Sequence, residues 1–168
     1  MKNKTKRLAY LGLSTSVAMV LAYIETLLPP LFSAVPGIKP GLTNIVIIFV
    51  LYRFGLPSAA CVSFVRIVAV TLLFGNPMTF AYSMAGGTLS LLAMALLHRL
   101  DLLSTIGVSV AGGVLHNVGQ ILAAMVLLQT AELGYYLVVL AVTGTVSGIF
   151  VGLCGGLAVK RIPEKIFK

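Results

Sequence analysis

The apolar stretches of this chain have the length that a lipid bilayer requires of an α-helix. The first runs from Leu8 to Leu28 with Glu25 as its single charged residue, and about 20 apolar residues cross the hydrocarbon core. Hydrophobic residues make up 59% of the 168 residues and charged residues 10%, whereas about a quarter of a soluble domain is charged. The chain is therefore predicted to be an integral membrane protein.

Proline, glycine and charged residues divide the apolar sequence into six segments. We predict one integral membrane domain over residues 1–168, all-α, folded as a six-transmembrane-helix bundle. The expected spans are about 8–28, 42–54, 58–74, 79–97, 104–128 and 134–159. The second span is short for a bilayer, and the Pro- and Gly-punctuated segment before it, Leu31–Asn44, cannot be regular helix throughout.

The net charge of +8 is concentrated at the two ends of the sequence. Eight of the twelve basic residues precede the first span or follow the last: Lys2, Lys4, Lys6, Arg7, Lys160, Arg161, Lys165 and Lys168. Basic residues beside membrane spans mark the cytoplasmic side, so both termini are predicted to be cytoplasmic. No basic stripe with interleaved aromatic residues is present, which argues against a nucleic-acid partner.

The acidic residues do not form a catalytic pattern. The chain has four, Glu25, Asp101, Glu132 and Glu164, and none lies close to another in sequence. Metal-assisted chemistry on diphosphates uses clustered carboxylates, and the phosphate-binding GxxxxGK[ST] loop is missing. We therefore expect neither enzymatic activity nor a metal or other cofactor.

Strongly polar residues inside the spans are the candidates for function. Arg66 lies near the middle of the third span, where a charge is costly and is by default a functional hypothesis. His116 and Gln120 are four residues apart on the fifth span and share one helix face, with Asn117 adjacent. The structural alternatives are an Arg66 satisfied by carbonyl groups or a buried glutamate, and amide and imidazole groups that hydrogen-bond between helices.

The predicted topology places these residues in the central to outer half of the bundle. The candidate solute-binding residues are Lys39, Asn44, Arg66, His116, Asn117 and Gln120. Together they predict a pocket that opens outward and offers positive charge and amide donors. A small polar or anionic solute is expected to bind there.

Small residues recur every four positions in two spans. Ser14, Ala18 and Ala22 form one stripe on the first span, and Gly144, Gly148, Gly152 and Gly156 form another on the last. Such stripes let helices approach closely in lipid. We interpret the glycines as internal packing, and expect the stripe of the first span to be exposed and to dock a partner helix.

Three segments carry a resemblance to a known family. They are "PGIKPGLTNIV" (Pro36–Val46), "FAYSMAGGTLSLLAM" (Phe80–Met94) and "GVSVAGGVLHNVGQILAA" (Gly107–Ala124). With these segments the chain resembles, over nearly its whole length, the Gx transporter family, whose members are often labelled heptaprenyl diphosphate synthase component I. Arg66 stands where that family has an arginine in its third span.

The resemblance implies a role in solute uptake. The family is similar in length and organisation to the S-components of energy-coupling factor (ECF) importers. These are six-helix proteins of the bacterial cytoplasmic membrane that capture a vitamin-like solute outside the cell. A transmembrane coupling protein with two ATPase subunits supplies the energy. S-components contact the coupling protein through an AxxxA face on the first helix, which Ala18 and Ala22 match here.

Two other functions stay open. One is a non-catalytic membrane subunit of a complex in prenyl or quinone synthesis, or in flavin-linked electron transfer. The other is an autonomous secondary transporter, which would carry inverted repeats and paired broken helices. Only the segment 36–44 looks broken in this sequence, so the transporter ranks last.

Overall fold

The described part of the chain is made of α-helices and one 3₁₀-helix, with short connections from Asn44 onward. The computed structural model describes residues 2–27 and 41–162, with side chains from Lys4 onward. Lys39 lies outside the described residues. The elements are α1 (Lys2–Leu27), α2 (Asn44–Phe54), α3 (Leu56–Phe74), α4 (Pro77–Leu100), α5 (Thr105–Leu128), the 3₁₀-helix η1 (Ala131–Tyr136) and α6 (Leu137–Arg161).

Five helical segments are long and apolar enough to cross a membrane. They are Lys4–Leu27, Leu56–Phe74, Pro77–Leu100, Thr105–Leu128 and Ala131–Arg161. The prediction of an all-α, multi-pass membrane protein is thus confirmed. Helix α2 has 11 residues and is therefore about 16 Å long, roughly half of the hydrocarbon core. The described part of the chain accordingly supplies five spanning helices, one fewer than predicted.

Local sequence explains where α4 begins and ends. Asn76 Oδ1 accepts the Thr79 N–H and Thr79 Oγ1 accepts the Asn76 N–H, each at 2.9 Å, which forms a capping box. Pro77 takes the first helical position, where its missing N–H costs nothing. The helix ends at Leu100, because the next residue, Asp101, has φ 51° and leaves the right-handed region. Helix α4 thus extends over Pro77–Leu100, beyond the predicted 79–97.

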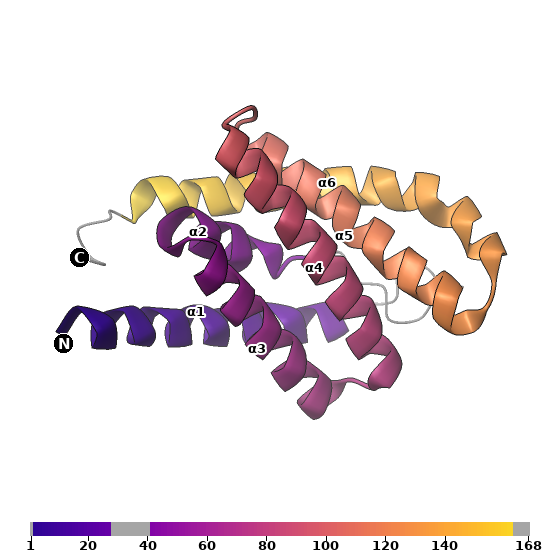
Figure 1. The fold of residues 1–168 in the computed structure, drawn as a ribbon, viewed down its shortest axis with the longest axis horizontal. Coiled ribbons are helices and arrows are strands. Elements are labelled where there is room, and N and C mark those ends of the chain that lie inside the picture. Colours follow the sequence, from indigo (N-terminus) through magenta and orange to yellow (C-terminus); the bar gives the residue numbers. More distant parts are fainter. Residues whose placement is uncertain (1, 28–40, 163–168) are drawn as a thin grey trace.

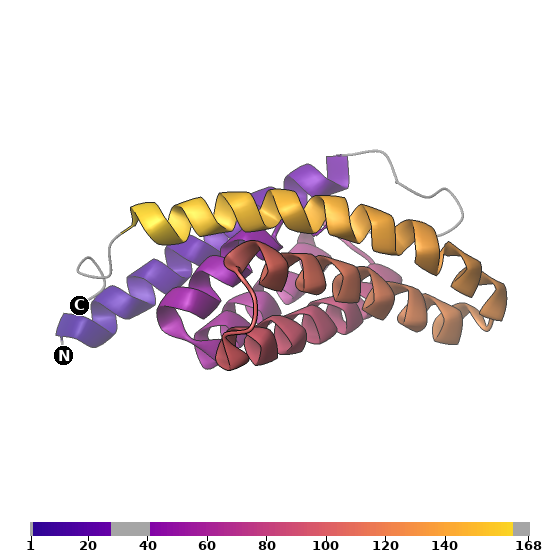
Figure 2. The ribbon, with the colours of Figure 1, turned by 90° about the horizontal axis from the view of Figure 1, so that it is seen from above.

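Successive helices run in alternating directions along a single elongated bundle (Figures 1 and 2). Helix α5 packs along both α4 and α6, while α1 packs mainly on α3. The short α2 lies inside, with six buried residues: Asn44, Val46, Ile47, Ile48, Val50 and Leu51. The start of α1 and the end of α6 lie at the same end of the bundle in both views.

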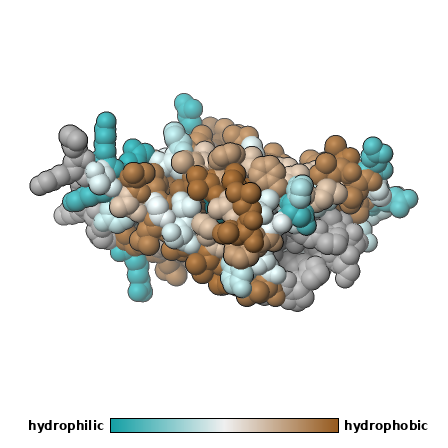
Figure 3. All heavy atoms as spheres, turned by 90° about the horizontal axis from the view of Figure 1, so that it is seen from below, coloured by the Kyte–Doolittle hydropathy of each residue, from teal (hydrophilic) through white to brown (hydrophobic). Residues whose placement is uncertain are grey.

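The outer surface of the bundle is apolar. Apolar residues cover most of the middle of the face in Figure 3, and hydrophilic residues gather toward its two ends. Large apolar side chains are highly exposed on it, including Leu72, which is 80% exposed, and Val126, which is 76% exposed. An apolar surface this extensive is typical of contact with a membrane.

Glycines bring α5 and α6 into backbone contact. A Cβ at Gly148 would lie 2.6 Å from Val110 Cα, and one at Gly144 would lie 2.8 Å from the Gly113 carbonyl oxygen. Gly152 is equally close to the backbone of Ile106. These three glycines of the predicted stripe therefore serve internal packing, as the sequence indicated.

Gly148→Ala is expected to lower the free energy of unfolding by about 1–3 kcal/mol, because the added methyl group forces α5 and α6 apart. Gly156→Ala is the matched control on the same stripe. Its nearest neighbour would be Thr105 Cγ2 at 3.6 Å, an ordinary contact. Equilibrium unfolding in mixed detergents measures both variants, and equal stability of the two would contradict the assignment of Gly148 to a tight seam.

The stripe of the first span lies differently from the prediction. Ala18 and Ala22 are 0% and 1% exposed, and Ser14 is half-buried. Ala18 belongs to the core cluster that also contains Ile47, Leu51 and other residues of α2 and α3. The expectation of an exposed docking stripe is therefore wrong. Small side chains here let α1 approach its own neighbours, and a buried alanine is not available to a partner helix.

Candidate functional site

Polar side chains from five helices are buried inside the bundle. The buried charged and amide-bearing or imidazole-bearing residues are Glu25, Asn44, Arg66, His116, Asn117 and Gln120, and Ser90 is buried with them. Polar groups in a membrane core need internal partners. The question at each residue is therefore which group satisfies it.

His116 and Gln120 form a pair on α5. Their Nε2 atoms are 2.7 Å apart, one helical turn from each other. Helix α4 closes over the pair at Gly86, where a Cβ would lie 2.6 Å from the His116 carbonyl oxygen and 2.8 Å from Gln120 Cγ. Only glycine permits this approach. The pair therefore faces the bundle interior, as predicted.

The entry to α2 also reaches this pair. Gly41 has φ +82°, and a Cβ there would lie 3.3 Å from His116 Cδ2 and 3.2 Å from Asn44 Nδ2. The left-handed backbone favours glycine at this position. Asn44 in turn has Nδ2 at 3.5 Å from Ser90 Oγ on α4. Asn44 and His116, distant in sequence, thus both lie beside Gly41, in agreement with a topology that allowed them to converge.

Asn117 faces the interior but points toward α6. Its Nδ2 donates to the Leu140 carbonyl at 2.8 Å and lies 3.4 Å from Thr143 Oγ1. Adjacent residues on a helix are rotated by about 100°, which separates Asn117 from the His116–Gln120 face. Asn117 therefore braces α5 against α6.

Arg66 lies in the middle of α3 and is 5% exposed. Its Nε and Nη2 have no hydrogen-bond partner among the described residues. Glu25 on α1 is close enough to interact electrostatically with Arg66, and Arg66 with His116. A buried guanidinium with donors left open is costly unless something else satisfies it.

Glu25 and Ser90 are the additions that the structure makes to the candidate site. The Glu25 carboxylate accepts the Leu42 backbone N–H and so ties the start of α2 to α1. In the sequence Glu25 marks only the outer end of a span. Ser90 is one of many hydroxyl residues in the spans and carries no signal that separates it from the others.

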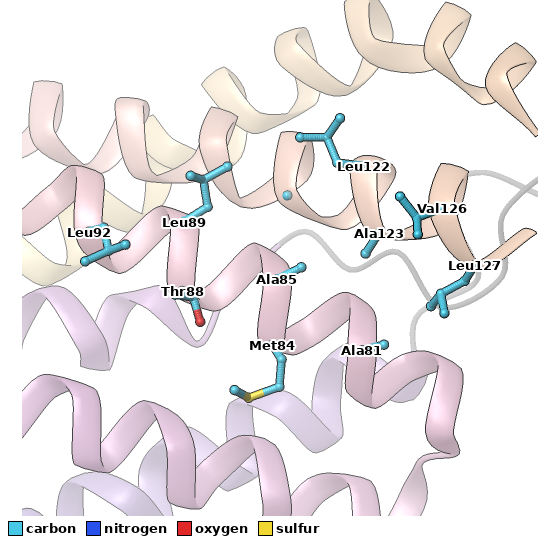
Figure 4. Close-up of a pocket in the computed structure, with 11 residues that line it drawn as sticks. Ala81, Met84, Ala85, Thr88, Leu89, Leu92, Leu122, Ala123, Val126 and Leu127 are labelled. Atoms are coloured by element: carbon cyan, nitrogen blue, oxygen red, sulfur yellow. The ribbon is translucent and has the colours of Figure 1, made fainter. Parts of the chain in front are cut away.

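Two grooves on the outer surface flank α4. The larger, of about 720 Å³, lies between α4 and α5 and is lined by apolar residues such as Ala85, Leu89 and Leu122, with Thr88 beside them (Figure 4). The smaller, of about 340 Å³, lies between α3 and α4. Such walls suit hydrocarbon chains of the membrane. The buried polar cluster, and not these grooves, has the chemistry to bind a polar solute.

One comparison with known proteins gives a match. The sequence model of a family described as heptaprenyl diphosphate synthase component I matches residues 14–157. No curated protein and no solved structure matches the chain. Within residues 2–27 and 41–162, no group of three or more His, Cys, Asp or Glu side chains could hold a metal ion.

Proposed function

The chain belongs to the family described as heptaprenyl diphosphate synthase component I, and on that premise we propose that it is a membrane-embedded, solute-binding subunit of an ECF-type importer. In this role it captures a small polar or anionic solute from outside the cell and has no catalytic activity. A coupling protein in the membrane and two ATPase subunits supply the energy, since the chain has no phosphate-binding loop of its own.

Arg66 is the observation that carries the proposal. A cation in the middle of a spanning helix is expensive, and its presence calls for a specific counterpart. Glu25 is near, yet two of the guanidinium nitrogens stay without a partner in the described part of the chain. Asn44, His116 and Gln120 gather their polar groups in the same interior. A bound solute would satisfy the two open guanidinium nitrogens and lie beside these groups.

The proposed topology has six spans, with both termini cytoplasmic in a bacterial cytoplasmic membrane. Two features support it. The start of α1 and the end of α6 lie at the same end of the bundle, which fits six passes when the short α2 counts as one of them. That end carries Lys4, Lys6, Arg7, Lys160 and Arg161, in agreement with the positive-inside rule.

A second candidate starts from the wording of the family description. It names a component of a synthase, which is compatible with a non-catalytic membrane subunit of a prenyl- or quinone-synthesis complex. A subunit of a flavin-linked electron-transfer complex is the other form of this alternative. Such a subunit needs protein contacts but no solute site. The two candidates therefore differ in whether the isolated protein holds a small molecule.

Purified wild-type protein is expected to release a small molecule, close to one per chain, when it is denatured and its extract is analysed by mass spectrometry. Arg66→Gln is expected to lose at least nine-tenths of that molecule, because a hydrogen bond to a charged group is worth about 1.5–3 kcal/mol, or a factor of ten or more. Thermal unfolding measured on the same samples reports whether the variant is folded.

Arg53→Gln is the matched control. Arg53 Nη2 donates to the carbonyl oxygens of Val159 and Ile162 at the end of α6, so this arginine ties α2 to α6. Its loss should lower stability and leave the solute bound. A wild-type extract without a small molecule would overturn the importer proposal. Unchanged solute content in folded Arg66→Gln would remove Arg66 from the site.

A further inference from the structure

We infer that the solute carries a carboxylate, and that this group binds the side-on edge of Arg66 formed by Nε and Nη2. The inference rests on the proposed solute-binding role and names the chemical class of the ligand. Two nitrogens of the Arg66 guanidinium lack a hydrogen-bond partner in the part of the chain that the structure describes. Nε and Nη2 are the buried guanidinium atoms without a partner in the described residues.

These two nitrogens form one edge of the planar guanidinium group. Their N–H bonds point in parallel within the guanidinium plane, so they can donate two hydrogen bonds to the two oxygens of a single carboxylate. A neutral carbonyl or hydroxyl would engage one of them and leave the other buried and unpaired. The open edge therefore selects a planar group with two acceptor oxygens.

Glu25 does not close this edge. Its carboxylate accepts the Leu42 N–H, just before α2, whose N-terminal end attracts negative charge through the helix dipole. Part of the stabilisation of Glu25 thus comes from the backbone. Arg66 keeps attraction for a second anion, whose other end can meet the amide and imidazole groups of Asn44, Gln120 and His116.

The charge of the site favours a carboxylate over a phosphate. A phosphate monoester carries about −1.5 to −2 charges at neutral pH, and Arg66 is the one buried cation among the described side chains of the cluster. Glu25, also buried, adds a negative charge nearby. Against the described charges, a dianion would therefore add one more uncompensated negative charge than a monoanion does, in a medium where unpaired charge is costly.

Titration of the arginine Nε–H resonances tests this inference directly. The chain has five arginines, Arg7, Arg53, Arg66, Arg99 and Arg161, so ¹⁵N spectra contain five Nε–H signals. The signal that disappears in Arg66→Lys belongs to Arg66. If Arg66→Lys does not fold, lysine substitutions at the other four arginines assign their signals, and the remaining signal is that of Arg66. Protein washed until its denatured extract holds no small molecule is titrated with formate, acetate, acetamide, chloride and inorganic phosphate at constant ionic strength.

Formate and acetate are expected to shift the Arg66 signal saturably, with a half-saturating concentration about tenfold or more below that of acetamide or chloride. The other four signals should move little. Equal shifts with chloride or acetamide, or a stronger response to phosphate than to acetate, would overturn the carboxylate assignment. A co-purified solute whose mass does not increase on methyl esterification would also overturn it while leaving the importer proposal intact. A wild-type extract without any small molecule would contradict the importer proposal and not the carboxylate assignment.

Discussion

Glu25→Gln is expected to lower the free energy of unfolding by about 3–5 kcal/mol, the cost of leaving a buried charge without its counterpart. Glu25 and Arg66 are both buried and interact electrostatically. Glutamine keeps the shape of the side chain and can still accept the Leu42 N–H, so the variant removes the charge and little else. Equilibrium unfolding in mixed detergents measures the change.

The double variant Glu25→Gln with Arg66→Gln separates an ion pair from two independent residues. With both charges removed, no unpaired charge stays in the core. The free energy of unfolding of the double variant should therefore fall by less than the sum of the two single-variant decreases. Glu132→Gln, at an exposed position of η1, is the control for loss of a carboxylate. Additive decreases in the free energy of unfolding would show that the two charges do not stabilise each other.

This pair explains why the third span tolerates an arginine at all. A single charge in a spanning helix destabilises it, whereas a charge that interacts with a carboxylate on α1 is satisfied in part. What stays open on Arg66 is then available for binding. The proposed binding uses Nε and Nη2, and its effect can be measured separately from stability.

Much of the fold could be predicted because lipid makes one requirement dominant. A spanning helix must satisfy its own backbone and present apolar side chains, so hydropathy alone located the five long helices of the described chain. The same requirement predicted that His116, Asn117 and Gln120 would turn inward, and the structure confirms it. Helix ends were less predictable, because capping by Asn76 and Thr79 depends on local hydrogen bonds.

The candidate site was predictable in its members and less so in their roles. Periodicity places His116 and Gln120 on one face, but the sequence does not say that Asn117 reaches Leu140 on α6. Glu25 was visible as a charge near a span end, and its contact with Leu42 depends on how the chain enters α2. Such roles depend on contacts between helices, which hydropathy does not encode.

The stripe of Ser14, Ala18 and Ala22 shows where pattern alone fails. Small residues at every fourth position allow close approach of a helix, whether that helix belongs to the same chain or to another. The burial of Ala18 and Ala22 identifies the neighbour as the chain itself. Any surface of α1 available to a partner must therefore lie on the opposite face, where Leu13, Val17 and Val20 are exposed.

Ala18→Leu combined with Ala22→Leu is therefore expected to destabilise the isolated protein, by about 1–3 kcal/mol for each substitution, because overpacking forces off-rotamer side chains and backbone shifts. Both alanines are fully enclosed, and Ala18 contributes to the core cluster formed with α2 and α3. The expected result is a lower unfolding midpoint in detergent, together with loss of any co-purified solute, since Glu25 lies on the same helix, less than one turn beyond Ala22.

Val17→Leu combined with Val20→Leu is the matched control, because it adds bulk to the exposed face of the same helix. This variant should stay as stable as the wild type and keep its solute. If α1 docks a coupling protein through that outer face, the control variant is also the one that should weaken co-purification of the partner. The opposite result is an Ala18→Leu, Ala22→Leu variant that is stable and binds solute but does not co-purify with the coupling protein. It would mean that the alanine stripe becomes exposed in the membrane and docks the partner.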